Sequence, residues 1–205
     1  MPARRSITNK EDWGDSPALF ETSVEIFRYL VVIGASEEMI AEVAHMKRMV
    51  AEHIGSFRGD RAIAHMTLMY MYVPIEYERD MLAAIESAAK DHVSFTVEFR
   101  NIHLLPDNST IYIDPLQKDP IIALRKDIKK HLQSLRGLKK LGVHVTSMPM
   151  ITIARKLKPQ QAAMAMEILR PHEYHRSELV DEVILLRGSQ KEGGKYEVTG
   201  RIGLP

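Results

Sequence analysis

The feature that most constrains the fold is an order of strand and helix signals that occurs twice along the chain. In the first half, apolar and β-branched runs at residues 24–33, 62–72 and 93–99 predict three strands. Apolar residues spaced by three and four positions predict helices between them, over residues 39–54 and 74–89. The first half is therefore predicted to fold as β-α-β-α-β.

The second half repeats this order. One helix is expected over residues 121–135, and another between the helix-opening Pro159 and the helix-closing Pro171. The turn before the last strand is assigned to Gly193 and Gly194. The strand signals lie at residues 110–113, 143–154, 179–186 and 196–202, with Pro149 interrupting the second of them.

The two halves are offset by 85 residues, taken from His65 and Met150 at equivalent strand positions (150 − 65 = 85). A duplication of this kind lets the corresponding strands face one another across a groove, with converging side chains. We predict one domain over residues 21–205, whose lobes are not separable, and a polar tail over residues 1–20.

Composition limits the functions that are open to the chain. It has no cysteine, which excludes disulfides, thiolate zinc sites and cysteine nucleophiles and favours a reducing compartment, so we expect a cytoplasmic protein. The longest apolar run, residues 29–35, is too short to span a bilayer, and we expect no membrane contact. Because the net charge is only +1, any contact with RNA should be local and small.

The residue that carries chemistry in the first half is His65, at the centre of the second predicted strand. Strand side chains alternate, so His65 and Thr67 should project to one face, and Met66 and Leu68 to the other. A histidine exchanges protons near neutral pH, and a threonine hydroxyl can hydrogen-bond a phosphate oxygen. One such pattern is weak by itself, because a lone strand histidine is more often structural.

The equivalent strand of the second half, residues 149–157, reads Pro-Met-Ile-Thr-Ile-Ala-Arg-Lys-Leu. The two strands together resemble the paired signatures of the two-histidine (2H) phosphoesterase superfamily, and of its bacterial 2′-5′ RNA ligase-like branch in particular. There, Pro-His-x-Thr is followed by an apolar residue, a small residue and often Arg. The resemblance extends over most of residues 22–203. In this chain Met150 stands where the second histidine belongs.

The resemblance implies an α+β fold with two pseudo-symmetric halves and antiparallel sheets flanking a central groove. It implies that His65 is a general base or acid, and that Thr67 and Thr152 hold phosphate oxygens. Met150 and Arg155 would contact the substrate, although Arg155 has the opposite strand parity to Thr152. The implied substrate is a 2′-5′ or 2′,3′-cyclic phosphodiester of a nucleotide or RNA end. The chemistry would need no metal and no cofactor, and we expect a monomer.

Met150 divides the functional hypotheses, because a thioether has no proton to give. Losing one proton-transfer group costs on the order of 10² to 10⁴ in rate. The first hypothesis is a cyclic phosphodiesterase or RNA ligase-like enzyme impaired at this position. The second is a pseudoenzyme that binds a nucleotide or RNA end without turnover. The third is an interaction domain that keeps only the scaffold.

A rival for the second histidine is His144, which begins a His-x-Thr of its own. Six extended residues separate it from Met150, a span of roughly 20 Å. Unless the chain bends at residues 147–149, His144 is too far away to deliver the same proton. We therefore favour Met150 as the equivalent of His65, and interpret His144 as a partly exposed residue at a strand start.

The remaining polar residues give weaker signals. A basic run over residues 125–140 is interpreted as a solvated helix face, with steering of a phosphate-bearing substrate as the alternative. Arg187 is a candidate for substrate contact by the resemblance of the closing strand alone. His172 and His175 flank Glu173 in a predicted loop, and we expect no metal site there.

Overall fold

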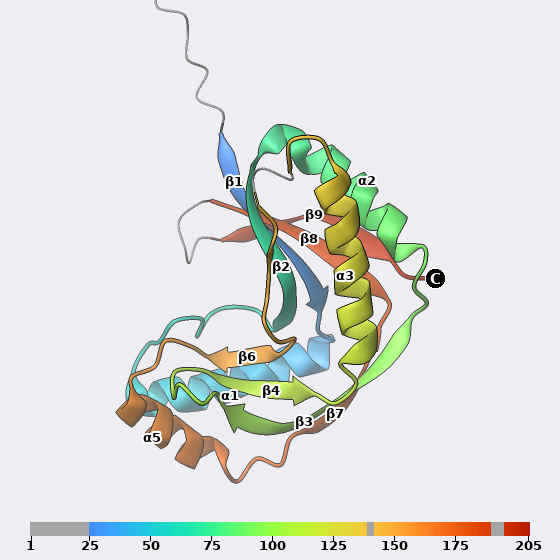
Figure 1. Cartoon of the computed structure of the whole chain (residues 1–205). Coiled ribbons are helices and arrows are strands. Elements are labelled where there is room, and N and C mark those ends of the chain that lie inside the picture. The colour runs from blue at the N-terminus through green and yellow to red at the C-terminus, as the bar shows by residue number, and fades with distance from the viewer. Residues whose placement is uncertain (1–24, 139–141, 190–194) are drawn as a thin grey trace, which may run out of the picture.

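The computed structural model describes residues 25–138, 142–189 and 195–205 (Figure 1). Three features predicted from the sequence lie outside these ranges: the tail over residues 1–20, the turn at Gly193 and Gly194, and the end of the basic run at Lys139 and Lys140. In the described part of the chain, no helix is long and apolar enough to cross a membrane.

The strands and helices follow the predicted order with shifted boundaries. The strands are β1 (Ile26–Gly34), β2 (His65–Pro74), β3 (Phe95–Leu104), β4 (Ile111–Pro115), β5 (His144–Val145), β6 (Ile151–Ala154), β7 (His175–Val180), β8 (Glu182–Gly188) and β9 (Tyr196–Gly203). The helices are α1 (Glu37–Ile54), the 3-10 turn η1 (Ile75–Tyr77), α2 (Glu78–Ala89), α3 (Asp119–Ser134) and α5 (Pro159–Leu169).

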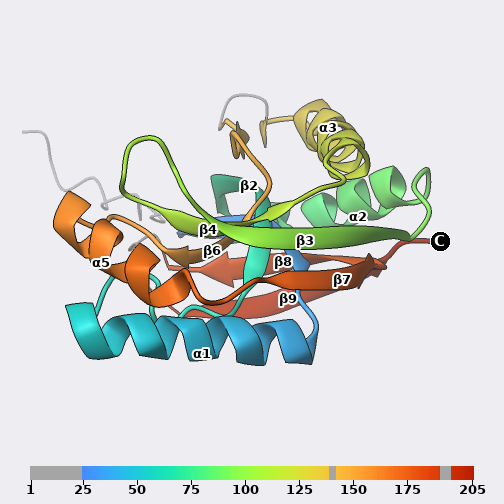
Figure 2. The ribbon, with the colours of Figure 1, turned by 90° about the horizontal axis from the view of Figure 1, so that it is seen from below.

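The nine strands pair antiparallel in the order β7-β3-β4-β6-β2-β1-β8-β9, with β5 beside β2. We call β7, β3, β4 and β6 with α1 and α5 the first lobe, and the other strands with α2 and α3 the second lobe. Figure 2 shows the two helix pairs on opposite sides of the strands. The α+β fold with antiparallel sheets is therefore confirmed. Each lobe draws strands from both halves of the chain.

The prediction of one strand over residues 179–186 is wrong, because two strands occupy this region. β7 ends at Val180 and pairs with β3 in the first lobe, whereas β8 starts at Glu182 and pairs with β1 in the second. Between them, the Asp181 carbonyl accepts a hydrogen bond from the Leu204 backbone. Both strands bury apolar side chains, so the hydrophobic pattern continues across a break that only strand pairing reveals.

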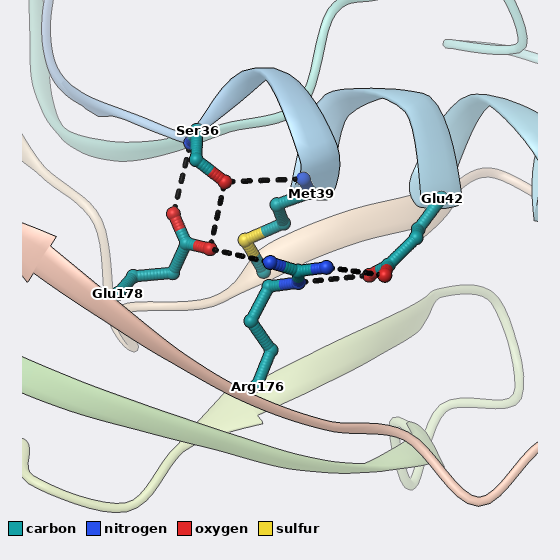
Figure 3. Close-up of polar contacts among 5 residues, drawn as sticks. All are labelled: Ser36, Met39, Glu42, Arg176 and Glu178. Carbon is teal, nitrogen blue, oxygen red and sulfur yellow. Dashed lines mark hydrogen bonds and ion pairs between the residues drawn. The ribbon is translucent and has the colours of Figure 1, made fainter.

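A polar network fastens the start of α1 to the edge strand β7 (Figure 3). Ser36 caps α1, since its Oγ accepts a hydrogen bond from the Met39 backbone at 3.1 Å. Its own backbone N–H and hydroxyl donate to Glu178, which is 8% exposed, at 2.9 and 2.8 Å. Next to Glu178, Arg176 donates from Nε and Nη2 to the Glu42 carboxylate. This network orients the helix that precedes β2.

Candidate functional site

The exposed face of β2 carries the first motif. His65 and Thr67 are partly exposed, whereas Met66 and Leu68 are fully buried. The register with β1 shifts at Leu68, because Val31 pairs with Met69 and Val32 pairs with Thr67. Leu68 is therefore the extra residue of a β-bulge. We call the side of the sheet that bears His65 and Thr67 the motif face.

The second motif strand lies directly beside the first. Met66 of β2 pairs with Ile151 of β6 in antiparallel register. If this register is continued by one residue in each direction, Thr152 lies opposite His65, and Met150, which precedes β6, lies opposite Thr67. Side chains opposite one another across two strands have Cβ atoms roughly 4.5–5.5 Å apart. Met150 and Thr152 are both partly exposed, as are His65 and Thr67 on the neighbouring strand.

A second bulge repeats the geometry of the first. On β6, Thr152 pairs with Tyr112 and Ala154 with Ile111, which leaves Ile153 as the extra residue. Ile153 and Leu68 differ by 85 positions (153 − 68 = 85), the offset that relates Met150 to His65. The two motif strands thus share a local backbone irregularity as well as a sequence pattern. The shared offset of the bulges agrees with the interpretation that Met150 corresponds to His65.

Simple strand alternation predicted that Arg155 points to the opposite face from Thr152, and the second bulge changes this. Ile153 and Ala154 are both buried, so alternation resumes one residue late and Arg155 is partly exposed. Its guanidinium is close enough to help lower the pKa of His65, after the larger effect of burial. Residues 57–59 lie beside it, and Arg58 forms an isolated antiparallel bridge with Arg155. The structure therefore brings Arg155 to the motif.

His144 belongs to β5 and lies beside a different part of β2 from His65. It starts β5 and pairs with Tyr70, and the two rings stack with centroids 4.8 Å apart. Between His65 and Tyr70 lie four regular strand steps and one bulged residue, about 13 Å along β2. The segment after β5 is fixed to β2, because Thr146 Oγ1 donates to the Thr67 carbonyl at 2.8 Å. His144 is therefore not the neighbour of His65.

His65 is held as a proton acceptor. Its Nδ1 lies 2.8 Å from the Ile63 carbonyl oxygen, and since a carbonyl only accepts, Nδ1 carries the proton. Nε2 of the neutral ring is then unprotonated. Burial lowers the pKa of His65, and the positive charges of Lys47 and Arg155 lower it further, against the opposing hydrogen bond to Ile63. In this neutral state Nε2 is able to accept a proton.

A group of aromatic side chains around Arg28 was not predicted from the sequence. The Arg28 guanidinium lies 5.2 Å from the Tyr70 ring centroid and 5.9 Å from that of Tyr72. Burial raises the pKa of Tyr196, while Arg28 and Arg155 act in the opposite direction, so Tyr196 lies near both arginines. Tyr70 and Tyr72 reach the motif face only because of the bulge at Leu68. Simple alternation from His65 would have pointed them away.

Arg187, a candidate for substrate contact by resemblance, lies on the side of the sheet opposite to the motif face and pairs with two glutamates there. It lies opposite Tyr29, which is fully buried, and its Nη1 donates to Glu78 of α2 at 2.9 Å. Its Nε donates to Glu197 at 2.7 Å. Strand alternation explains this placement, because its neighbour Leu186 packs on the other side with Leu30 and Val32.

The basic run lies on α3, whose buried stripe is Ile121, Leu124, Ile128 and Leu132. Lys126 and Lys130 are exposed on the opposite side, in agreement with a solvated face. Arg125 is used internally, because its Nη1 donates to the Thr146 carbonyl at 2.7 Å. Among the residues that the structure describes, no group of three or more His, Asp or Glu side chains is arranged to hold a metal.

Comparisons with known proteins give a consistent relationship. A family model described as the 2'-5' RNA ligase superfamily matches residues 35–192. The crystal structure of E. coli LigT complexed with 3'-AMP has a TM-score of 0.62 and 16% identity, covering 88% of this chain and 99% of that chain. The crystal structure of TT0787 of Thermus thermophilus has a TM-score of 0.62 and 19% identity, covering 86% of this chain and 97% of that chain.

LigT complexed with NADP+ has a TM-score of 0.58 and 19% identity, covering 88% of this chain and 99% of that chain. No curated protein matches the sequence. At these identities the solved structures show a shared fold and no more. The family model matches most of the chain, and the family assignment rests on it.

Proposed function

Because this chain belongs to the 2'-5' RNA ligase superfamily, we propose that it binds the phosphodiester of a nucleotide or RNA end on the motif face and turns it over slowly. The observation that carries this proposal is the antiparallel register of Met66 with Ile151. It gathers one histidine and two threonine hydroxyls on adjacent strands, with Arg155 beside them. A phosphate needs such donors and a positive charge.

In the proposed reaction, the substrate is a 2′,3′-cyclic phosphate. Nε2 of His65 takes a proton from water as the water oxygen bonds to phosphorus, and one ribose P–O bond breaks. The hydroxyls of Thr67 and Thr152 and the guanidinium of Arg155 hold the phosphoryl oxygens. The leaving ribose oxygen must then collect its proton from solvent, because Met150 occupies the position from which a second histidine would supply it. The product is a nucleoside monophosphate.

The aromatic side chains provide a surface on which the nucleobase of the ligand can stack. Tyr70, Tyr72 and Tyr196 lie on the same face of the second lobe, around Arg28. Aromatic rings and guanidinium planes stack on nucleobases without requiring a particular sequence. LigT has been crystallised with 3'-AMP and with NADP+, which is consistent with a nucleotide ligand for a chain of this fold.

A second candidate is a binding protein without turnover, and Met150 is the observation that favours it. A single proton-transfer residue leaves the barrier roughly 3 to 5.5 kcal/mol higher than a complete pair would. The deciding experiment measures binding and hydrolysis of 2′,3′-cyclic AMP by the unsubstituted protein and by His65→Ala. Slow turnover that disappears in His65→Ala supports the enzyme. Binding with the same negligible hydrolysis in both supports the binding protein, and no binding refutes both.

A further inference from the structure

The most deeply buried cation near the motif is Lys47 of α1. Its side chain is 3% exposed, yet α1 is otherwise an amphipathic helix whose buried positions are apolar. Burying an ammonium group costs free energy unless hydrogen bonds satisfy it, so a lysine retained here needs an explanation. Its surroundings point to the loop between α1 and β2.

The Lys47 ammonium donates to two backbone carbonyls of that loop. Nζ lies 2.9 Å from the Gly59 oxygen and 2.6 Å from the Ala62 oxygen. The loop is tightened further by the Ala62 N–H, which donates to the same Gly59 carbonyl at 3.1 Å. One residue after Ala62 comes Ile63, whose carbonyl accepts the Nδ1 proton of His65. Lys47 is thus connected through one hydrogen bond and one peptide bond to Ile63, whose carbonyl orients the His65 ring.

The same loop connects the two motifs. Arg58 lies near the centre of this loop and forms a backbone bridge with Arg155, the residue directly after β6. A cation that holds the loop therefore influences the residue after the second motif as well as the residue before the first. The charged groups that act on Lys47 are Asp60, which favours its charge, and Arg155, which opposes it. Those that act on His65 are Lys47 and Arg155.

We propose that Lys47 is a positioning residue of the phosphate site, whose buried ammonium fixes the loop before His65 and supplies a positive charge behind the motif at neutral pH. The charge favours the neutral, proton-accepting form of His65 and attracts a phosphate that does not touch Lys47 itself. The effect on phosphate binding rests on the proposed function. The effect on His65 concerns the ligand-free protein and does not depend on that function.

The first test is an NMR titration of the His65 imidazole in the ligand-free protein. Lys47→Met removes the charge and both hydrogen bonds, and we expect the pKa of His65 to rise. Lys47→Arg keeps a cation and should retain most of the unsubstituted behaviour. Arg48→Met is the matched control, because Arg48 is exposed on the same helix. An unchanged His65 pKa in Lys47→Met, or an equal rise in Arg48→Met, would overturn the proposal.

A measurement on the unsubstituted protein covers the case in which Lys47→Met does not fold. Burial lowers the pKa of Lys47 to about 8. Loss of its proton should therefore appear as a second inflection in the His65 chemical shift near pH 8. A single inflection for His65, with none near that pH, would also refute the coupling.

The second test uses inorganic phosphate and 2′,3′-cyclic AMP as probes, at pH 7 and at pH 9. We expect Lys47→Met to bind both about fivefold more weakly at pH 7, and the difference to shrink at pH 9, where Lys47 is largely neutral. Equal affinities at pH 7 would refute the electrostatic role. If the unsubstituted protein binds neither probe, the proposed function fails, while the ligand-free titration still decides the role of Lys47.

Discussion

Leu68 and Ile153 are each the extra residue of a β-bulge, one residue after the threonine of each motif strand. Because each bulge reverses the alternation beyond it, Tyr70 in the first half and Arg155 in the second return to the face of their motif threonines. Their separation is again 85 residues (155 − 70 = 85). The internal duplication therefore supports the interpretation that Met150, and not His144, corresponds to His65.

Restoring the missing histidine should raise turnover. We expect Met150→His to hydrolyse 2′,3′-cyclic AMP on the order of 10² faster than the unsubstituted protein, because it supplies a proton to the leaving oxygen. The rate should fall at low pH, where His65 is protonated, and at high pH, where the new histidine is neutral. Steady-state kinetics across pH would measure this. His65→Ala in the same background should abolish the gain, and the exposed Met164→His serves as control. A rate equal to that of the unsubstituted protein would contradict the assignment.

Removing the threonine hydroxyls should weaken phosphate binding. Thr67→Val and Thr152→Val keep the side-chain shape and delete one donor each, which costs about 1–1.5 kcal/mol, or roughly tenfold in affinity. Calorimetric titration with inorganic phosphate would detect this. Thr96→Val, at an exposed position of β3, should bind normally. If all three variants bind alike, the hydroxyls of Thr67 and Thr152 do not hold the ligand.

Removing an aromatic ring should separate base binding from phosphate binding. Tyr70→Ala should bind 2′,3′-cyclic AMP about tenfold more weakly, because stacking contributes about 1–3 kcal/mol per base. Its affinity for inorganic phosphate should stay unchanged, since Tyr70 lies about 13 Å along β2 from His65. Parallel titrations of the two ligands make each variant its own control. An equal loss for both ligands would indicate a general disturbance of β2.

The contact between Glu178 and Ser36 should be a strong contributor to stability. Glu178→Gln turns one acceptor toward Ser36 into a donor and leaves Arg176 without one of its two carboxylates. We expect a loss of about 2–3 kcal/mol in the free energy of unfolding, measured by urea denaturation. Glu173→Gln, at an exposed position before β7, should change it by less than about 0.5 kcal/mol. Equal stability of the two variants would rule out this role.

The ion pair between Arg176 and Glu42 should make stability depend on acid pH. The hydrogen bond from Arg176 lowers the pKa of Glu42, and burial only partly opposes this. A carboxyl group with a lowered pKa stabilises the fold above its unfolded pKa, and this contribution disappears as pH falls through the folded pKa. The stability difference between the unsubstituted protein and Glu42→Gln should therefore be present at pH 7 and vanish in strong acid. A difference that stays constant across this range would contradict the pairing.

The local patterns of the sequence determined the elements and their order. The buried stripe of α3 at Ile121 and Leu124 and the cap of α1 at Ser36 depend on residues close in the chain, so helix periodicity and capping chemistry predict them. The offset of 85 residues between the two halves could also be obtained from the sequence, because it requires only the comparison of one strand pattern with another. The same reasoning placed His65 and Thr67 on one face of a strand.

Tertiary structure alone decided which strands are neighbours and where their registers slip. The apolar run over residues 179–186 reads as one strand, but it is divided at Asp181. Its first part belongs to β7, which pairs with β3, and its second part belongs to β8, which pairs with β1. The orientations of Tyr70 and Arg155 depend on one unpaired residue in each motif strand, and the carbonyls that hold Lys47 come from a loop that no periodicity describes. These features arise from pairing between distant segments, whose energies are set by partners that local sequence does not contain.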